Sequence, residues 1–136
     1  MKLKAIKIKG TTIQLKDISL EAIEKCFNYN RIKSFDRHVK TKTVDIDVVT
    51  IYGVCFRFNK GKLFEFILEE NIEDRAKNII FIDNKDNEIS ALNLYNLFGM
   101  CGIGNDSEME SPYDNIICEP SKLVLGLFVR LRLKEE

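Results

Sequence analysis

The chain has 136 residues and a mass of 15.8 kDa, which is enough for one compact domain and too little for two ordinary ones. Hydrophobic residues make up 45% of the chain and charged residues 31%, a balance that excludes a disordered or low-complexity protein. Lys and Arg number 21 and so do Asp and Glu, whereas nucleic-acid-binding domains are usually clearly basic. No apolar run approaches the roughly 18 residues that a membrane span requires.

The N-terminal residues and the cysteines indicate the compartment. Residues 1–9 alternate lysine with aliphatic residues, whereas a signal peptide would have an unbroken apolar core. The cysteines at positions 26, 55, 101 and 118 form no close pair, so we expect reduced thiols in a cytoplasmic protein. Cys55 and Cys118 stand next to apolar residues and are expected to be buried as small hydrophobic side chains.

The first third of the chain is expected to contain two strands and one helix. Aliphatic residues at alternate positions predict a strand over residues 2–9, with a bulge near Ala5 where the alternation changes phase. A short second strand over residues 12–15 and a helix capped by Ser19 follow. Residues 31–42 are polar and basic, and they predict a loop or an exposed extension.

The middle of the chain carries the strongest β signal. β-Branched and aromatic residues run through residues 43–58 and predict β-structure there. The sequence Asn59-Lys60-Gly61 is typical of a hairpin turn, and it pairs this segment with a strand over residues 63–68. One or two helical turns are expected within residues 71–77.

A short strand and a second helix come next. The apolar residues of 78–83 predict a buried strand, followed by a polar turn over residues 83–87. Ser90 is expected to cap a helix over residues 91–98, which Gly99 would end.

The last third of the chain should begin with a long loop over residues 99–120. Leucine or valine then occupies every second position of residues 123–133, which predicts one long final strand. Many strands, two helices and no regular alternation of the two predict a single α+β domain over residues 1–136. We expect a mainly antiparallel sheet of about five to seven strands with two short helices packed on one face.

The zero net charge conceals segregation along the chain. Residues 1–42 hold 11 Lys and Arg against 4 Asp and Glu, and residues 121–136 hold 4 against 2. Residues 43–120 hold 6 against 15. The sequence therefore predicts either a polarised surface, if the basic ends lie together, or lysines that merely decorate strand edges.

Two segments with strong charge are the candidate protein-contact sites. Like charges at this density repel one another unless a partner meets them, and complementary charge tunes encounter rate and partner choice. The acidic candidates lie within residues 105–119 and the basic ones within residues 31–42. They are Asp106, Glu108, Glu110, Asp114, Glu119, Arg31, Lys33, Arg37, Lys40 and Lys42.

Motifs for catalysis and metal binding are weak. His38 is the single histidine, and nothing in the sequence places it near Cys101, the most accessible candidate thiol. The cysteines offer no chelating pair for zinc, and the acidic segment lacks the register of a calcium loop. The glycines of residues 99–104 follow a helix and lack the lysine of a phosphate loop. No cofactor or metal is expected.

We therefore expect a small, non-enzymatic cytoplasmic protein that binds another, larger protein and contacts no membrane. An inhibitor or an immunity or anti-defence protein of bacterial or phage type, acting on a nucleic-acid-handling enzyme, fits these features. The leading alternative is a metal-dependent nuclease or hydrolase that uses Asp45, Asp47, Asp83 and Lys85, because such enzymes hold a magnesium ion between carboxylates. A further, less favoured alternative is a subunit whose basic strands contact nucleic acid.

Overall fold

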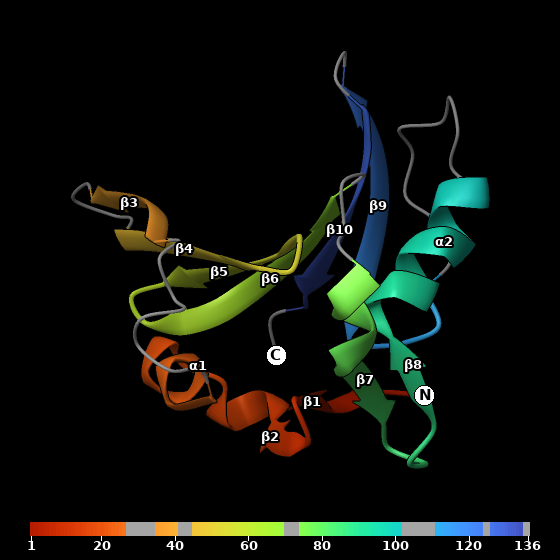
Figure 1. The fold of residues 1–136 in the computed structure, drawn as a ribbon, viewed down its shortest axis with the longest axis horizontal. Helices are drawn as coiled ribbons and strands as arrows, with labels where there is room; N and C mark the ends of the chain where they lie inside the picture. Colours follow the sequence, from red (N-terminus) through yellow and green to blue (C-terminus); the bar gives the residue numbers. More distant parts are fainter. Residues whose placement is uncertain (27–34, 41–44, 70–73, 102–110, 124–125, 135–136) are drawn as a thin grey trace.

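The computed structural model describes residues 1–26, 35–40, 45–69, 74–101, 111–123 and 126–134, and it arranges them in two antiparallel sheets with few helices. One sheet has four strands in the order β2-β1-β7-β8, and the other has six in the order β3-β4-β5-β6-β10-β9 (Figure 1). The strands are β1 (Leu3–Ile8), β2 (Thr11–Gln14), β3 (Phe35–Lys40), β4 (Asp45–Ile51), β5 (Val54–Asn59), β6 (Lys62–Glu69), β7 (Ile79–Asp83), β8 (Glu88–Ser90), β9 (Ile116–Leu123) and β10 (Gly126–Leu133). The helices are α1 (Leu20–Cys26) and α2 (Ala91–Cys101), with short 3-10 helices η1 (Leu15–Asp17) and η3 (Asp74–Asn78).

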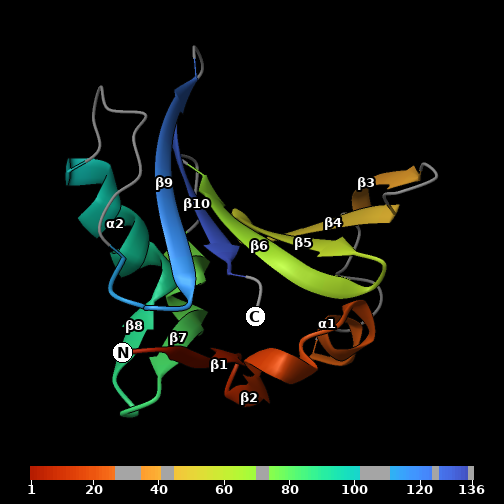
Figure 2. The ribbon, with the colours of Figure 1, turned by 180° about the vertical axis from the view of Figure 1, so that it is seen from behind.

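The predominance of antiparallel strands is confirmed, but the expected single sheet of five to seven strands is wrong. The four-stranded sheet, α1 and α2 all lie to one side of the six-stranded sheet (Figures 1 and 2). One cluster of buried apolar side chains joins these elements, and it includes Ile23 of α1 and Leu94 of α2. The two sheets pack on each other because β1 and β7 of one sheet and β5, β6 and β10 of the other present buried apolar side chains to this shared core.

Three phenylalanines connect the two sheets at the centre of the core. Phe56 of β5, Phe66 of β6 and Phe81 of β7 are fully buried. The ring centroids of Phe56 and Phe66 lie 5.4 Å apart, as do those of Phe66 and Phe81, and both pairs meet edge to face. This geometry is the favoured one for aromatic pairs. Phe66 therefore links a neighbouring strand of its own sheet to the opposite sheet.

Several local predictions are confirmed. The register of β1 with β7 shifts between Leu3 and Ala5, which is the bulge expected there. The Ser19 Oγ accepts a hydrogen bond from the backbone N–H of Ala22 (3.1 Å), and the Ser90 Oγ accepts one from the N–H of Asn93 (3.1 Å). Both serines thus cap their helices by satisfying an amide that the helix leaves free. Cys55 and Cys118 are buried free thiols, as expected.

Two hairpins shape the strands β4, β5 and β6. The expected turn joins β5 to β6, with Lys60 at φ 53° and Gly61 at φ 81°. A second turn of the same kind joins β4 to β5, with Tyr52 at φ 54° and Gly53 at φ 84°. Positive φ at both central residues matches the twist of the flanking strands. The single β-segment expected over residues 43–58 is therefore two strands, because the chain reverses at Tyr52.

Four other assignments differ from the expectation. Residues 35–40 form β3, paired with β4, where a loop or an exposed extension was expected. Helix α2 continues through Gly99 to Cys101, so that glycine does not end it. The expected final strand over residues 123–133 is a hairpin, because Leu123 ends β9 and β10 begins at Gly126. Residues 116–120, which were expected to belong to the preceding loop, are part of β9.

Candidate functional site

One face of the six-stranded sheet carries an ionic network. Cross-strand partners share a face of a sheet, so the strand register defines two rows of side chains across β4, β5, β6, β10 and β9. We call these ten residues the arginine face: Val48, Arg57, Glu65, Arg132 and Ile117 in the first row, and Thr50, Cys55, Ile67, Arg130 and Glu119 in the second.

The arginine face points away from the core. The alternate positions of the same strands, such as Phe56, Phe66 and Val129, are fully buried and belong to the core cluster. Among the described residues, no helix or strand lies over the opposite side of this sheet (Figures 1 and 2). As far as the described residues go, the arginine face is therefore the uncovered side of the larger sheet.

Glu65 is the centre of the network. Its side chain is completely buried although it stands on the uncovered side of the sheet. The Arg57 Nη1 donates to its Oε1 at 2.6 Å, and the Arg130 Nε and Nη2 donate to its Oε2 at 3.1 and 2.8 Å. The two arginines are 29% and 35% exposed, so they form the outer layer and shield the carboxylate from water. Charge-assisted contacts of this kind fix the position of both guanidinium groups.

A β-bulge helps to bring Arg57 to Glu65. The register pairs Phe58 with Leu63 and Arg57 with Glu65, which leaves Phe64 as the extra residue of β6. The Arg57 Cζ lies 5.2 Å from the centroid of the Phe64 ring. An extra residue re-aims the side chains around it, and a cation over an aromatic ring is held by the ring's quadrupole. Arg57 is thus held from two sides.

Arg132 extends the network to the edge strand. Its Nη2 forms an ion pair with the Glu119 carboxylate of β9. The Arg132 Nε is buried and has no hydrogen-bond partner among the described residues. The second row carries the half-exposed Ile67 between Arg130 and the buried Cys55, whose Sγ lies 3.1 Å from the Thr50 Oγ1. The face as a whole therefore carries guanidinium groups and aliphatic side chains next to one another.

Arginine and lysine are distributed differently. Arg57, Arg130 and Arg132 all lie on the arginine face, which contains no lysine. Lysines instead serve exposed ion pairs elsewhere, such as Lys4 with Asp86 and Lys7 with Glu88 on the four-stranded sheet. Arginine is enriched and lysine depleted in the cores of protein interfaces, because the planar guanidinium loses less on desolvation.

The two acidic candidate residues that the structure describes, Asp114 and Glu119, form ion pairs within the chain. The Asp114 carboxylate accepts from the N-terminal ammonium group of Met1 at 2.9 Å, and this contact lowers its pKa. Glu119 lies in β9 and pairs with Arg132. Asp106, Glu108 and Glu110 lie outside the described residues. The two described acids are thus members of intramolecular ion pairs, and only Glu119 belongs to the arginine face.

The basic candidate residues lie at the other end of the same sheet. Arg37 and Lys40 are in the edge strand β3, where Arg37 is the register partner of Val48. The position of Arg37 therefore continues the first row of the arginine face by one strand. Arg31, Lys33 and Lys42 lie outside the described residues.

The carboxylates of the nuclease alternative are separated by the topology. Asp45 and Asp47 lie in β4 of the six-stranded sheet, whereas Asp83 ends β7 of the four-stranded sheet. Lys85 follows Asp83 in the turn and donates its backbone N–H to the Asp83 Oδ1 at 2.7 Å. Within the described part of the chain, no group of three or more His, Cys, Asp and Glu residues could hold a metal ion.

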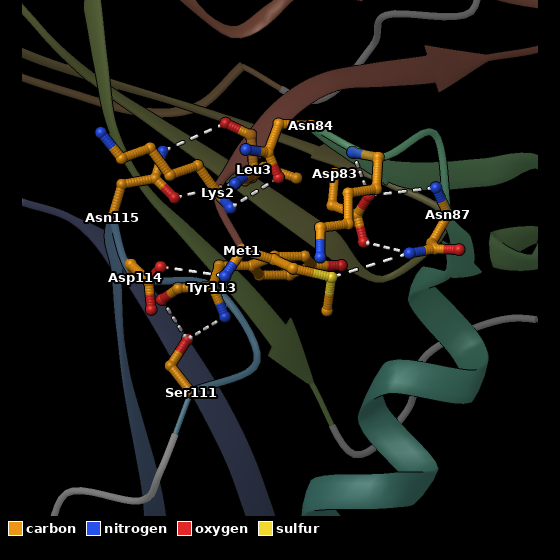
Figure 3. Close-up of polar contacts among 11 residues, drawn as sticks. Met1, Lys2, Leu3, Asp83, Asn84, Asn87, Ser111, Tyr113, Asp114 and Asn115 are labelled. Carbon is orange, nitrogen blue, oxygen red and sulfur yellow. Dashed lines mark hydrogen bonds and ion pairs between the residues drawn. The ribbon is translucent and has the colours of Figure 1, made fainter.

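Asp83 organises its own turn, as Figure 3 shows. Its carboxylate also accepts from the backbone N–H and the side-chain Nδ2 of Asn87, each at 3.0 Å. Burial by itself would raise the pKa of Asp83, but the amide donors of Asn87 and Lys85 and the nearby N-terminal charge together lower it. The side chain therefore stabilises a turn, which is the structural role that its sequence context also suggests.

The N-terminal strand is held by two asparagines beside this turn. The Asn115 amide accepts from the Leu3 N–H at 2.8 Å and donates to the Leu3 carbonyl at 3.1 Å, as a neighbouring strand would (Figure 3). Asn84 contacts Lys2 in the same two-sided way, through its Oδ1 at 3.1 Å and its backbone N–H at 2.9 Å. These contacts satisfy backbone groups at the end of β1.

A pH-dependent loss of stability is expected from Tyr113, which packs in this region. Burial, with smaller contributions from Asp83 and Cys118, raises the pKa of Tyr113 from 10.0 to about 12. The stabilisation linked to the neutral phenol is therefore complete below pH 10. It is lost as the pH rises from about 10 through about 12, by about 3 kcal/mol in all. Urea denaturation at about pH 9 and 11.5 should show a smaller loss in Tyr113→Phe than in the natural chain, and an equal loss would contradict this assignment.

Basic residues from both ends of the chain form ion pairs with acidic residues from its middle segment. Strand β1 lies in the four-stranded sheet and β10 in the six-stranded one, so the two basic ends of the chain belong to different sheets. Lys4, Lys7 and Arg132 each pair with an acidic residue of the middle segment. Strand pairing between distant segments thus balances part of the charge that the sequence separates.

Sequence reasoning missed Arg57 and Glu65 as site residues. Both were assigned to the hairpin around Asn59-Lys60-Gly61, and that turn alone places them on paired strands. The signal available in the sequence was Glu65, which stands between two phenylalanines in a short strand. The turn at Asn59-Lys60-Gly61 places this carboxylate opposite Arg57. The contribution of Arg130 required the pairing of β10 with β6, which no local pattern indicates.

Comparisons of the chain with protein-family models, with curated proteins and with solved structures found no match. None of the helices in the described residues combines the length and apolar character needed to cross a membrane.

Proposed function

We propose that this chain is a small, non-enzymatic cytoplasmic protein that binds another, larger protein through its arginine face. The observation that carries the proposal is the completely buried Glu65 held by two arginines on the uncovered side of the larger sheet. An inhibitor or a neutralising protein directed against a nucleic-acid-handling enzyme remains the form of binding protein that we favour.

The energetics of buried ion pairs support an interaction role. Removing two or three charges from water costs about as much as their attraction returns, so such a network adds little net stability compared with apolar packing. It does hold charged groups in one arrangement, which a recognition surface requires. Arg57 and Arg130 are held in this way before any partner arrives.

The composition of the arginine face also supports binding. Val48, Ile67 and Ile117 are half-buried, and each is the register partner or row neighbour of an arginine, whereas the solvent side of an antiparallel sheet is usually polar. Phe128, beside the second row on β10, is half-exposed as well. Aromatic, aliphatic and arginine side chains that alternate on one surface are typical of the residues that dominate binding energy.

Partner capture with matched variants tests the proposal. Ile67→Asn changes an aliphatic side chain of the arginine face, and Leu97→Ser makes a comparable change on α2, where the side chain is 52% exposed. Tagged natural chain and both variants would be incubated with the same cell extract, and bound proteins quantified by mass spectrometry. We expect one protein to be retained by the natural chain and Leu97→Ser and reduced about tenfold with Ile67→Asn, because the side chain lies near the centre of the contact. Equal capture by all three chains, or loss with Leu97→Ser alone, would place binding elsewhere.

A further inference from the structure

We infer that the arginine face recognises carboxylate groups on an acidic segment of the partner protein. This inference rests on the proposed function and specifies the chemistry of the partner. It follows from the way the network distributes its charges between the inner and outer layers of the face.

The negative charges of the network are less accessible than the positive ones. Glu65 is fully buried and Glu119 is 28% exposed, whereas Arg132 is 40% exposed. Both oxygens of Glu65 are already occupied by Arg57 and Arg130. A partner that approaches this side therefore meets guanidinium groups first.

The guanidinium groups retain donors for such a partner. Arg57 uses Nη1 and Arg130 uses Nε and Nη2 in the network, and each guanidinium has five N–H donors in a planar fork. Arg132 uses Nη2 for Glu119, and its side chain is the most exposed of the three arginines at 40%, although its Nε is buried. Carboxylates match the geometry of this fork, and two parallel hydrogen bonds form with each well-placed acid.

The surroundings favour a protein rather than a nucleic acid as the source of the negative charge. The ten residues of the arginine face include three arginines and two glutamates, a smaller excess of positive charge than phosphate backbones usually require. Val48, Ile67 and Ile117 lie beside the arginines on this face, and these aliphatic groups suit side chains rather than sugars and phosphates. An acidic segment with apolar residues among its carboxylates is complementary to both features.

A titration with defined probes tests this chemistry. The first probe is a 12-residue peptide in which glutamate alternates with threonine and valine, the second is the same peptide with glutamine for glutamate, and the third is a 12-nucleotide oligothymidine. Binding would be followed by the NMR signals of the arginine Nε–H groups at about pH 6 and low salt, up to millimolar probe. We expect the glutamate peptide to shift the signals of Arg130 and Arg132 and the other two probes to shift them far less.

Two variants separate the arginine face from general charge effects. Arg132→Gln removes an ion-paired arginine of the face, and Lys4→Gln removes an ion-paired lysine of the four-stranded sheet. We expect Arg132→Gln to weaken binding of the glutamate peptide about five- to tenfold, the effect of one charged hydrogen-bonding group, and Lys4→Gln to leave it unchanged.

Three results would overturn the inference. They are no shift of the arginine signals at millimolar glutamate peptide, equal shifts with the glutamine peptide, and tighter binding of the oligothymidine. If Ile67→Asn still abolished partner capture in any of these cases, the arginine face would remain a protein-binding surface without selectivity for acids. The proposed function and the acidic partner can therefore fail separately.

Discussion

Replacing Phe66 with alanine is expected to lower the free energy of unfolding by about 4 kcal/mol, the largest effect of any substitution considered for this chain. The ring is fully buried and meets Phe56 and Phe81 edge to face, with both centroids at 5.4 Å. The variant would lose the burial of the ring and both aromatic contacts, and it would leave a cavity between the two sheets.

Urea denaturation followed by circular dichroism would measure this loss. Phe128→Ala is the matched control, because that ring is half-exposed on the other side of the larger sheet. We expect it to cost about 1 kcal/mol or less. If the two substitutions had equal effects, the packing of the sheets on each other through Phe66 would be refuted.

The Glu65→Gln variant should be destabilised by about 3 kcal/mol. The change removes the negative charge that holds two partly buried guanidinium groups, and breaking a buried pair from one side leaves uncompensated charge. Glu119→Gln breaks the more exposed pair with Arg132 and should cost no more than about 1 kcal/mol. Both values can be obtained from the same urea titrations.

The triple variant Arg57→Leu, Glu65→Leu and Arg130→Leu distinguishes a stabilising network from a recognition surface. Apolar side chains of similar size often replace a buried ionic network at no cost, so we expect stability within about 1 kcal/mol of that of the natural chain. The same variant should no longer capture the partner. A large loss of stability in the triple variant would mean that the network serves the fold itself.

Local features of the fold were predictable because short-range chemistry determines them. Ser19 and Ser90 cap their helices, and Lys60 and Gly61 form the expected turn, since each depends on neighbours within four positions. The bulge near Ala5 was visible as a change of phase in the alternation of apolar residues. These features require no knowledge of which strands meet.

Two of the errors arose where one apolar run contains a chain reversal. Tyr52 adopts a positive φ that is unfavourable for a bulky residue, and partial packing of its side chain against the core offsets the cost. The turn between β9 and β10 likewise interrupts a row of leucines that continues on both sides. Hydrophobic periodicity reports which residues are buried and does not report where a strand ends.

The candidate site was the least predictable part, because its residues come from strands that are distant in sequence. Glu65 and Arg130 are brought together only by the pairing of β6 with β10. The sequence places Glu119 in the expected loop as a candidate contact residue because acids stand close to it, and the pairing of β9 with β10 changes that environment. Charge counted along the chain therefore located Glu119 and Arg37 but not the network that joins the arginines.

The distribution of arginine and lysine has a practical consequence for chemical labelling. Reagents that acylate primary amines attack lysines such as Lys4 and Lys77, which stand outside the ten positions with Arg57, Arg130 and Arg132. Immobilisation on an amine-reactive sensor chip would thus attach the molecule through amines outside these ten positions, including the exposed Lys134 that follows β10. Dicarbonyl reagents modify guanidinium groups instead, so they would reach a different set of side chains, which includes Arg57, Arg130 and Arg132.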